Sequence, residues 1–477
     1  FSVIIDGAGG VWTVGANNRG QLGRNSDANV LKKVVIGTPD NKAVAVAAGS
    51  DHTVVLDEQG RVWTAGGNLY GQLGVKAGAN GMLSSQPYFT QVTDGIGDTK
   101  IVAIAAGYYS TVLLDENGKV WTAGSNLRGQ LGRPENAGST AGTNGEAPAN
   151  PTFAQVTGDI ADVKAVGIAS GMYHLVVLDE NGRVWTAGQN VFGMTGRTFS
   201  GNYDATLAQA AVGKDNAKIK AVYAEQYSTF LLDDSGKVWA AGCNNYAELG
   251  LPKSYGSVKK FTNVTDGLDG AMIAAVVPGQ SHITLIGVDG NAYSAGMNTR
   301  GQLGRTTDDQ IVYGLTKITE GVDGVRFIDG AAGGQHTLLK DSSGNLWSVG
   351  NNDYKQLARD ENKDTQNANS TFGKITAEIN SDYSLDDLKD RQVSGDTTVT
   401  IYFKERAKIK VNYVLGGGEW IDGYTAPDFY YDGDSFTPPT ADKLTKKGYL
   451  LTDWSSVTNN GVVTYYANWE LRTYTVK

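Results

Sequence analysis

One aromatic position recurs seven times along the chain and constrains the fold more than any other feature. The same sequence motif surrounds each occurrence, for example HTVVLDEQGRVWTAGGNLYGQLG from His52 and STVLLDENGKVWTAGSNLRGQLG from Ser110. A repeat of this period indicates units that bury their apolar faces only against one another. The occurrences are spaced 51 to 64 residues apart: Trp12, Trp63, Trp121, Trp185, Trp239, Tyr293 and Trp347.

Each repeat predicts a four-stranded sheet. TVVLD and RVWTAG alternate apolar with small or polar residues, and the DEQG turn between them is typical of a β-hairpin. KAVAVAAG upstream adds a strand whose small residues suit the crowding near the axis of a ring, and a third or fourth strand, such as FTQV from Phe89, completes the sheet. Seven such sheets predict an all-β, seven-bladed β-propeller.

The pattern DxxGxVWxxGxNxxGQLG, preceded by AAGxxHT, resembles the RCC1 (regulator of chromosome condensation) repeat over residues 1–376. Phe1 aligns with His52, so the first repeat lacks its upstream AAG strand and the ring needs a strand from elsewhere. Neither FGKITAEI from Phe372 nor RQVSGDTTV from Arg391 matches that pattern well. The sequence therefore leaves the closing strand open.

The remainder of the chain is expected to form a separate module. Residues 377–407 are interpreted as a linker or a partial module, with a strand at Thr398 to Phe403 that resembles the closing strand of bacterial mucin-binding-type modules. Residues 408–471 resemble the InlB B-repeat (Listeria-Bacteroides repeat), which implies a small β-grasp-like domain of bacterial surface proteins, and residues 472–477 resemble the start of a further repeat. The residues that carry the InlB resemblance are the Tyr413 strand with its Gly416 to Gly418 turn, the Gly448-Tyr449 pair, Trp454 and the final TYYANW.

Charge and composition narrow the possible partners. A net charge of -9 disfavours a nucleic-acid backbone as partner, and no apolar run approaches the roughly 18 residues that a membrane span needs. Cys243 is the single cysteine, which excludes an intrachain disulfide and a multi-cysteine metal site. The chain begins at Phe1, from which we expect a fragment or a processed chain.

Catalytic and metal sites find little support in the motifs. Ser110 and Ser228 take the histidine position in other repeats, which favours a structural hydrogen bond that fixes the blade's inner turn over metal binding or catalysis. The repeat tryptophans are expected to pack between blades. The DEQG-type turns lack the further ligands of a calcium loop, and nucleophile, metalloprotease and phosphate-loop motifs are absent. We therefore predict no catalytic residue, no metal and no cofactor. The four histidines lie eleven residues before their repeat's Trp or Tyr: His52, His174, His282 and His336.

The candidate ligand-binding residues come directly before the histidine or serine of three consecutive repeats. Equivalent positions fall on one face of a propeller, so the tyrosines should form an arc near the central opening, and Tyr is a favoured interface residue. Long connections at 75–88, 133–151 and 197–215 either rim this site or are tolerated insertions. The predicted site comprises Tyr108, Tyr109, Met172, Tyr173, Gln226 and Tyr227.

A second ring of residues precedes the GQLG turns and is expected to cover blade edges rather than to bind. It comprises Arg19, Tyr70, Arg128, Phe192, Tyr246, Arg300 and Tyr354.

The leading functional hypothesis is an adhesin-like head on the cell surface or wall of a Gram-positive-type bacterium. It would bind an extracellular protein or glycan through one propeller face, without catalysis. The alternatives are a secreted enzyme inhibitor or another RCC1-type interaction module, including one for nucleotide exchange on a small GTPase. A glycan-acting enzyme would instead need carboxylates converging in the central channel. The ligand's identity and the oligomeric state are left open.

Overall fold

The computed structural model describes residues 1–25, 28–38, 41–75, 85–134, 150–213, 217–359 and 369–375, and beyond these the backbone of strands between 399 and 471. The chain divides into two compact units, Phe1–Phe403 and Lys404–Lys477. Every regular element in the described part of the chain is a strand, which confirms the all-β prediction. Within those residues, no helix has the length and apolar character to cross a membrane.

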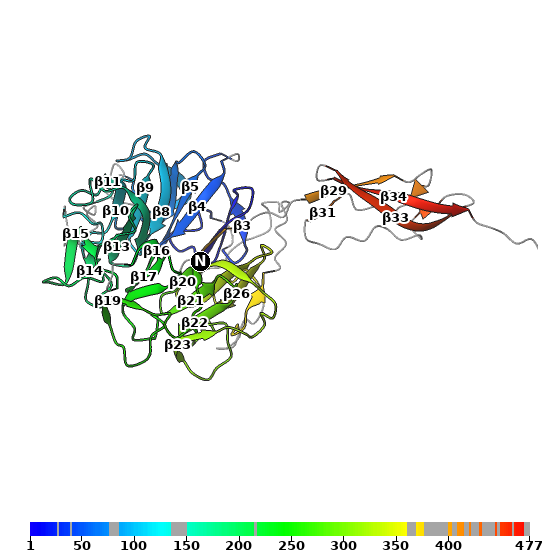
Figure 1. The fold of residues 1–477 in the computed structure, drawn as a ribbon. Helices are drawn as coiled ribbons and strands as arrows, with labels where there is room; N and C mark the ends of the chain where they lie inside the picture. The colour runs from blue at the N-terminus through cyan, green and yellow to red at the C-terminus, as the bar shows by residue number, and fades with distance from the viewer. Residues whose placement is uncertain are drawn as a thin grey trace, which may run out of the picture. The chain divides into compact units, whose positions relative to one another are not determined.

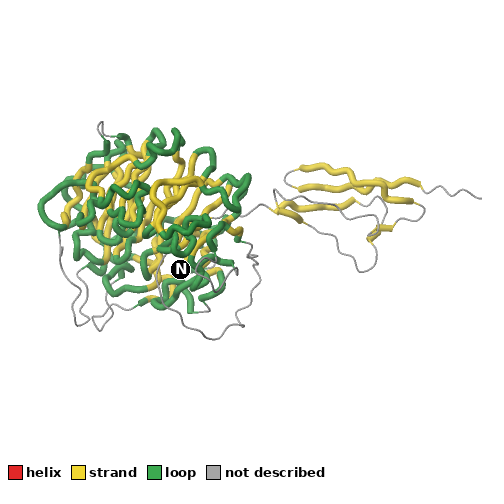
Figure 2. The backbone as a smooth tube through the Cα atoms, turned by 90° about the horizontal axis from the view of Figure 1, so that it is seen from below, coloured by secondary structure: helices red, strands yellow, loops and turns green. Residues whose placement is uncertain are grey.

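The first unit is a ring of seven four-stranded blades (Figures 1 and 2), as the repeat count predicts. In Figure 1 the inner strands β4, β8, β16 and β20 lie nearest the centre of the ring. From the inner to the outer strand, the first four blades are β28 (Val399–Tyr402), β1 (Ser2–Ile5), β2 (Val11–Val14), β3 (Lys32–Val34); β4 (Ala43–Ala48), β5 (His52–Asp57), β6 (Val62–Gly66), β7 (Gln86–Val92); β8 (Ile101–Ala106), β9 (Ser110–Asp115), β10 (Val120–Gly124), β11 (Ala154–Gln155); and β12 (Ala165–Ser170), β13 (His174–Asp179), β14 (Val184–Gln189), β15 (Tyr203–Ala210). The last three are β16 (Ile219–Glu225), β17 (Ser228–Asp233), β18 (Val238–Gly242), β19 (Val258–Asn263); β20 (Ile273–Pro278), β21 (His282–Gly287), β22 (Ala292–Met297), β23 (Ile311–Lys317); and β24 (Phe327–Ala332), β25 (His336–Asp341), β26 (Leu346–Gly350), β27 (Gly373–Lys374).

A buried aspartate explains why the D-x-x-G-x-x-W spacing recurs. In the second blade, Asp57 Oδ1 accepts hydrogen bonds from the backbone N–H groups of Gln59 (3.1 Å) and Arg61 (2.9 Å), which fixes the hairpin turn. Its Oδ2 accepts the indole N–H of Trp63 at 2.9 Å. One carboxylate thus holds both the turn and the tryptophan, and equivalent Asp–Trp bonds of 2.7 to 3.0 Å occur in blades 1, 3, 4, 5 and 7.

The sixth blade replaces both partners of this pair at once. Gly287 stands in the aspartate position and Tyr293 in the tryptophan position, so neither an indole donor nor its acceptor is left unpaired. The turn is held instead by Asp289, whose Oδ1 accepts the Asn291 backbone N–H at 3.0 Å. A Cβ at position 287 would lie 2.5 Å from that Oδ1, which explains the glycine.

The hydrophobic core is divided into seven clusters, each shared by two neighbouring blades. Trp63 packs with Phe1 and Val3 of the preceding blade, and Trp185 packs with Val112 and Leu114. The prediction that the repeat tryptophans pack between blades is confirmed. Because the apolar residues are buried between blades, each blade depends on its neighbours for its core.

The ring closes through a strand that the sequence patterns did not identify for that purpose. β28 pairs in parallel with β1, from Ser2 opposite Val399 to Ile5 opposite Tyr402. In the other six blades the inner strand is antiparallel to its neighbour. β28 also lies beside β24 and β4, so it completes the inner ring from a segment assigned to residues 377–407 rather than to the propeller.

The second unit contains a mixed sheet and a two-stranded ribbon. The sheet order is β31-β29-β34-β33, with β29 parallel to β34 and both outer pairs antiparallel, and β30 pairs with β32. Residues 472–477, predicted to begin a further repeat, lie outside the described residues. The strands are β29 (Lys408–Val414), β30 (Glu419–Trp420), β31 (Phe429–Tyr431), β32 (Leu444–Thr445), β33 (Tyr449–Asn459) and β34 (Val462–Leu471).

Candidate functional site

The four histidines connect neighbouring blades and do not form a site. His52 Nε2 lies 3.0 Å from Thr111 Oγ1 of the next blade, and that hydroxyl donates to the Gln72 carbonyl at 2.6 Å. Because the hydroxyl's one proton is used, Nε2 must be the donor to it. Equivalent hydrogen bonds join His174 to Thr229, His282 to Thr337 and, at 3.5 Å, His336 to Ser2.

Burial keeps these imidazoles neutral. It lowers the pKa of His52 and of His282 to about 3 and that of His174 to about 4. The hydrogen-bond role predicted for the histidines is confirmed, although the bond reaches the next blade instead of the same blade's inner turn. No group of three or more His, Cys, Asp or Glu side chains able to hold a metal occurs among the described residues.

A glycine three residues before each histidine leaves room for the ring. A Cβ at Gly49 would lie 2.1 Å from His52 Cε1, and one at Gly171 would lie 2.2 Å from His174 Cε1. The fifth blade carries Glu225 at this position and Ser228 in place of histidine. The two substitutions are complementary, because the smaller serine removes the ring that a side chain at 225 would strike.

Glu225 is thereby placed beside Gln226 and Tyr227, two of the predicted site residues. Burial raises the pKa of its carboxyl to about 8, opposed in part by a hydrogen bond from the Gln226 backbone. A carboxyl in this environment holds its proton near neutral pH. It is the most strongly perturbed carboxyl in the described part of the chain.

The loop before the second strand of each blade meets the GQLG-type turn of the blade before it. Thr111 and Thr229 donate to carbonyls of those turns, at Gln72 and Met194, at 2.6 Å each. This contact explains which side chains meet on the surface. Tyr70 of the second blade's turn reaches Tyr109 of the third blade, with ring centroids 4.6 Å apart.

The structure brings the predicted tyrosines together in two groups. Tyr108 and Tyr109 have ring centroids 6.2 Å apart, and Tyr173 and Tyr227, from neighbouring blades, 6.3 Å apart. The Met172 backbone N–H donates to the Gln226 carbonyl at 3.2 Å, which fixes these two loops to each other. All six predicted residues are half-buried.

Three further residues belong to the same surface and were expected only at blade edges. Tyr70 contacts Tyr109, and the Phe192 centroid lies 5.1 Å from that of Tyr227. Arg128 acts on Tyr173, whose pKa is raised by burial and by Tyr227, lowered by Arg128 and raised slightly by Tyr70. We call Tyr70, Tyr108, Tyr109, Tyr173, Phe192 and Tyr227 the aromatic cluster.

Two further predictions from the sequence concern the long connections around the site and carboxylates in the central channel. Of the long connections expected to rim the site, the greater part of the first two, 76–84 and 135–149, lies outside the described residues. The third is described from 197 to 213 and contains the outer strand β15 of the fourth blade. On the inner strands, Glu225 of β16 and Asp329 of β24 both have a raised pKa, caused first by burial. A glycan-acting enzyme would use inward-facing carboxyls of this kind, and that alternative stays a prediction.

Comparison with known proteins identifies the repeat. Residues 1–319 match the family model of the RCC1-like domain, and residues 327–356 match that of the Regulator of chromosome condensation (RCC1) repeat. The chain is 27% identical over 389 residues to the Regulator of chromosome condensation of Xenopus laevis, covering 77% of this chain and 85% of that protein. It is 27% identical over 314 residues to the Secretion-regulating guanine nucleotide exchange factor of Bos taurus, covering 64% of each.

Solved structures support the same fold. Human WBSCR16 superimposes with a TM-score of 0.67 at 17% identity, covering 77% of this chain and 95% of that one. Yeast RCC1 (Prp20), in its crystal structure bound to Kap60, superimposes with a TM-score of 0.64 at 19% identity, covering 77% and 83%.

Proposed function

The chain belongs to the RCC1-like domain family, and on that basis we propose that its propeller is a recognition head that binds its partner by contact alone, through the aromatic cluster. The observation that carries the proposal is the meeting of side chains from successive blades on one surface, above all Tyr70 with Tyr109 and Phe192 with Tyr227. No blade supplies this surface alone.

The physical character of the cluster suits binding. Tyr, Trp and Arg are enriched where side chains contribute most to an interface, and half-buried rings present a large contact area with few rotatable bonds. Hydrogen bonds to backbone carbonyls of the next blade hold the loops, from the Met172 N–H to Gln226 and from Ser50 Oγ to Tyr108 at 2.9 Å. A surface fixed before binding loses less entropy when it binds.

The proposed partner is an extracellular protein or a glycan, and the proposed location is a bacterial cell surface or wall. The support is the resemblance of residues 408–471 to the InlB B-repeat, together with the mixed sheet of the second unit, whose central strands β29 and β34 are parallel. A short wall-proximal module following a binding head is the arrangement expected of an adhesin.

The test compares two triple variants of the full chain on arrays of extracellular-matrix proteins and glycans. Replacing Tyr109, Tyr173 and Tyr227 by Ala should weaken binding by about a hundredfold, since buried interface anchors each contribute about 1 kcal/mol or more. The matched control replaces three exposed tyrosines outside the cluster, Tyr88, Tyr246 and Tyr255, and should change binding less than about threefold. Equal losses in both variants, or no binding by the unaltered chain, would refute the proposal.

A second candidate comes from the relatives, one of which is a guanine nucleotide exchange factor by name. It predicts faster release of labelled GDP from a small GTPase when the full chain is added. If the chain accelerates release and the Tyr109/Tyr173/Tyr227 variant does not, the cluster is an exchange surface and the adhesin role is wrong.

A further inference from the structure

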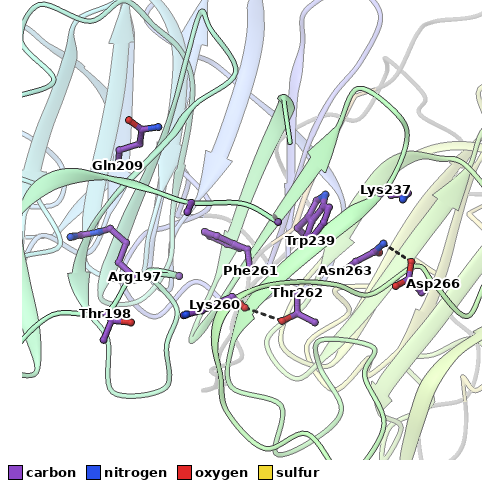
Figure 3. Close-up of a pocket in the computed structure, with 13 residues that line it drawn as sticks. Arg197, Thr198, Gln209, Lys237, Trp239, Lys260, Phe261, Thr262, Asn263 and Asp266 are labelled. Atoms are coloured by element: carbon purple, nitrogen blue, oxygen red, sulfur yellow. Dashed lines mark hydrogen bonds between the residues drawn. The ribbon is translucent and has the colours of Figure 1, made fainter. Parts of the chain in front are cut away.

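An open groove of about 940 Å³ lies between the fourth and fifth blades at the outside of the ring (Figure 3). It is lined by β15, β18 and β19 and by the turn after β14, and it shares no residue with the aromatic cluster. Figure 3 shows Phe261 and Trp239 between Arg197 on one side and Lys237 on the other. The volume is within the range of ligand sites, which is about 300–1,000 Å³.

The indole ring of Trp239 is the distinctive part of the groove. Its N–H already donates to Asp233 at 2.8 Å, so only the ring is available to a ligand. In the second and fourth blades an arginine guanidinium covers the equivalent indole, 5.7 Å from the ring centroid in each. The fifth blade has Lys237 at that arginine's position, and no cation lies over Trp239 among the described residues. The ring is half-buried, because it packs against the core between the fourth and fifth blades, and its remaining exposed part is not covered by a cation in the described part of the chain.

The charge of the groove is opposite to that of the chain. Arg197, Lys237 and Lys260 line it, against Asp266 as the one acidic lining residue, whereas the whole chain carries a net charge of -9. Arg197 is paired with Asp204 at 3.0 Å, but neither lysine takes part in an ion pair within the described residues. Two cations are therefore free to meet an anionic group.

The polar surroundings favour a saccharide over an acidic peptide. The exposed Gln209 amide makes no hydrogen bond within the described residues and is available to hydroxyl groups. A peptide that bound by adding a strand would find the edge of β19 already bridged to Val212 at Phe261. An aromatic ring with cations and an amide nearby matches a pyranose that carries an acidic substituent.

We propose that this groove is a second binding site, for an anionic saccharide whose sugar ring stacks on Trp239 and whose carboxylate or sulfate lies between Lys237 and Lys260. The site stands independently of the aromatic cluster. The uronate and the sulfate share the same recognition chemistry, and the two are separated by the probes below.

The experiment is affinity electrophoresis of the full chain through gels that contain polygalacturonate, dextran sulfate, neutral dextran or poly-glutamate. Retardation is expected with one or both anionic polysaccharides and not with neutral dextran. Lys237→Glu combined with Lys260→Glu should weaken binding by about tenfold or more, because two favourable charge contacts become repulsive.

The matched control carries the same charge change at exposed lysines outside the groove, Lys259→Glu with Lys317→Glu. Lys259 neighbours Lys260 on β19 but does not line the groove, so this variant should keep at least half of the affinity. Equal losses in both variants would show unspecific attraction and overturn the proposal, as would retardation by poly-glutamate alone or no retardation at all. The Tyr109/Tyr173/Tyr227 variant should bind these polysaccharides normally, which separates failure here from failure of the cluster.

Discussion

Adding a single methyl group at Gly171 tests whether glycine and histidine are coupled within a blade. The backbone at Gly171 does not have a positive φ, so alanine is compatible with its conformation. Its Cβ, however, would lie 2.2 Å from His174 Cε1, where carbon atoms normally approach to about 3.5–4.0 Å. The imidazole must move by more than 1 Å, roughly the difference between these distances, and would lose its 2.8 Å bond to Thr229.

The expected cost follows from these contacts. Overpacking contributes about 1–3 kcal/mol and the lost hydrogen bond about 1 kcal/mol, so Gly171→Ala should lower the free energy of unfolding by about 2–4 kcal/mol. His174→Ser loses the same bond and leaves a cavity, at a cost of about 3 kcal/mol. In the double variant the two nearest atoms, both of the imidazole, are gone and the next nearest is the Glu225 carbonyl oxygen at 3.1 Å, so the clash is largely relieved.

The double variant should therefore cost about 3 kcal/mol rather than the sum of the two, a coupling of about 2–4 kcal/mol. The measurement is urea unfolding of the full chain, followed by tryptophan fluorescence of the propeller transition. Additive costs would refute the reasoning. The fifth blade already contains the proposed combination, with Glu225 in the glycine position and Ser228 in the histidine position.

Three further predictions concern single groups and the closing strand. The Glu225 carboxyl has a pKa of about 8 in the fold and 4.5 as its reference value, so between these pH values the native state holds a proton that the unfolded state has lost. The free energy of unfolding should therefore fall as the pH rises through that window, by about 1–2 kcal/mol after allowance for partial exposure. Glu225→Gln should flatten this fall between pH 5 and 8.5. Cys243 is buried, and burial together with the Glu248 carboxylate raises its pKa to about 12, so a thiol reagent at pH 8 should label it only as the propeller unfolds; labelling within the mixing time in native buffer would contradict this. Residues 1–376, which lack β28 and expose the inner edge of β1, should melt about 5 °C or more below residues 1–403, and equal midpoints would show that β28 is dispensable.

The fold was predictable because its determinants are local and repeated. The Asp57 carboxylate, the turn it holds and the Trp63 indole lie within seven residues, so their spacing is visible in the text of every repeat. The closing strand was not predictable in the same way. β28 pairs in parallel with β1, so it has no hairpin turn beside it and none of the AAG pattern that the antiparallel inner strands share.

The candidate site was predictable only in part, for a geometric reason. Reading one repeat at a time places Tyr109, Tyr173 and Tyr227 at equivalent positions of successive blades. It does not show that the GQLG-type turn of one blade lies against the loop of the next, as Thr111 bonding to the Gln72 carbonyl does. For that reason the sequence assigned Tyr70 and Phe192 to the set of residues before the GQLG turns, whereas in the structure they contact Tyr109 and Tyr227 in the aromatic cluster.

The connection between successive blades also leaves a trace in the sequence that can be read without a structure. Wherever the preceding blade has histidine, the residue after the histidine or serine position bonds to that imidazole. Where the preceding blade has histidine, that residue is a hydroxyl: Thr111 after the blade of His52, Thr229 after that of His174, Thr337 after that of His282 and Ser2 after that of His336.

Where the preceding blade has serine, the same position is aliphatic: Leu175 follows the blade of Ser110, and Ile283 follows that of Ser228. A buried imidazole N–H without an acceptor costs free energy, so histidine occurs where the next blade offers it a hydroxyl. The loop residues two positions before the histidine need no particular side chain in the next blade. Ser50 Oγ bonds to the Tyr108 carbonyl and the Met172 N–H to the Gln226 carbonyl, and every residue has a carbonyl. Freedom to vary therefore coincides with the aromatic cluster, which is where selection for a partner can act without disturbing the ring.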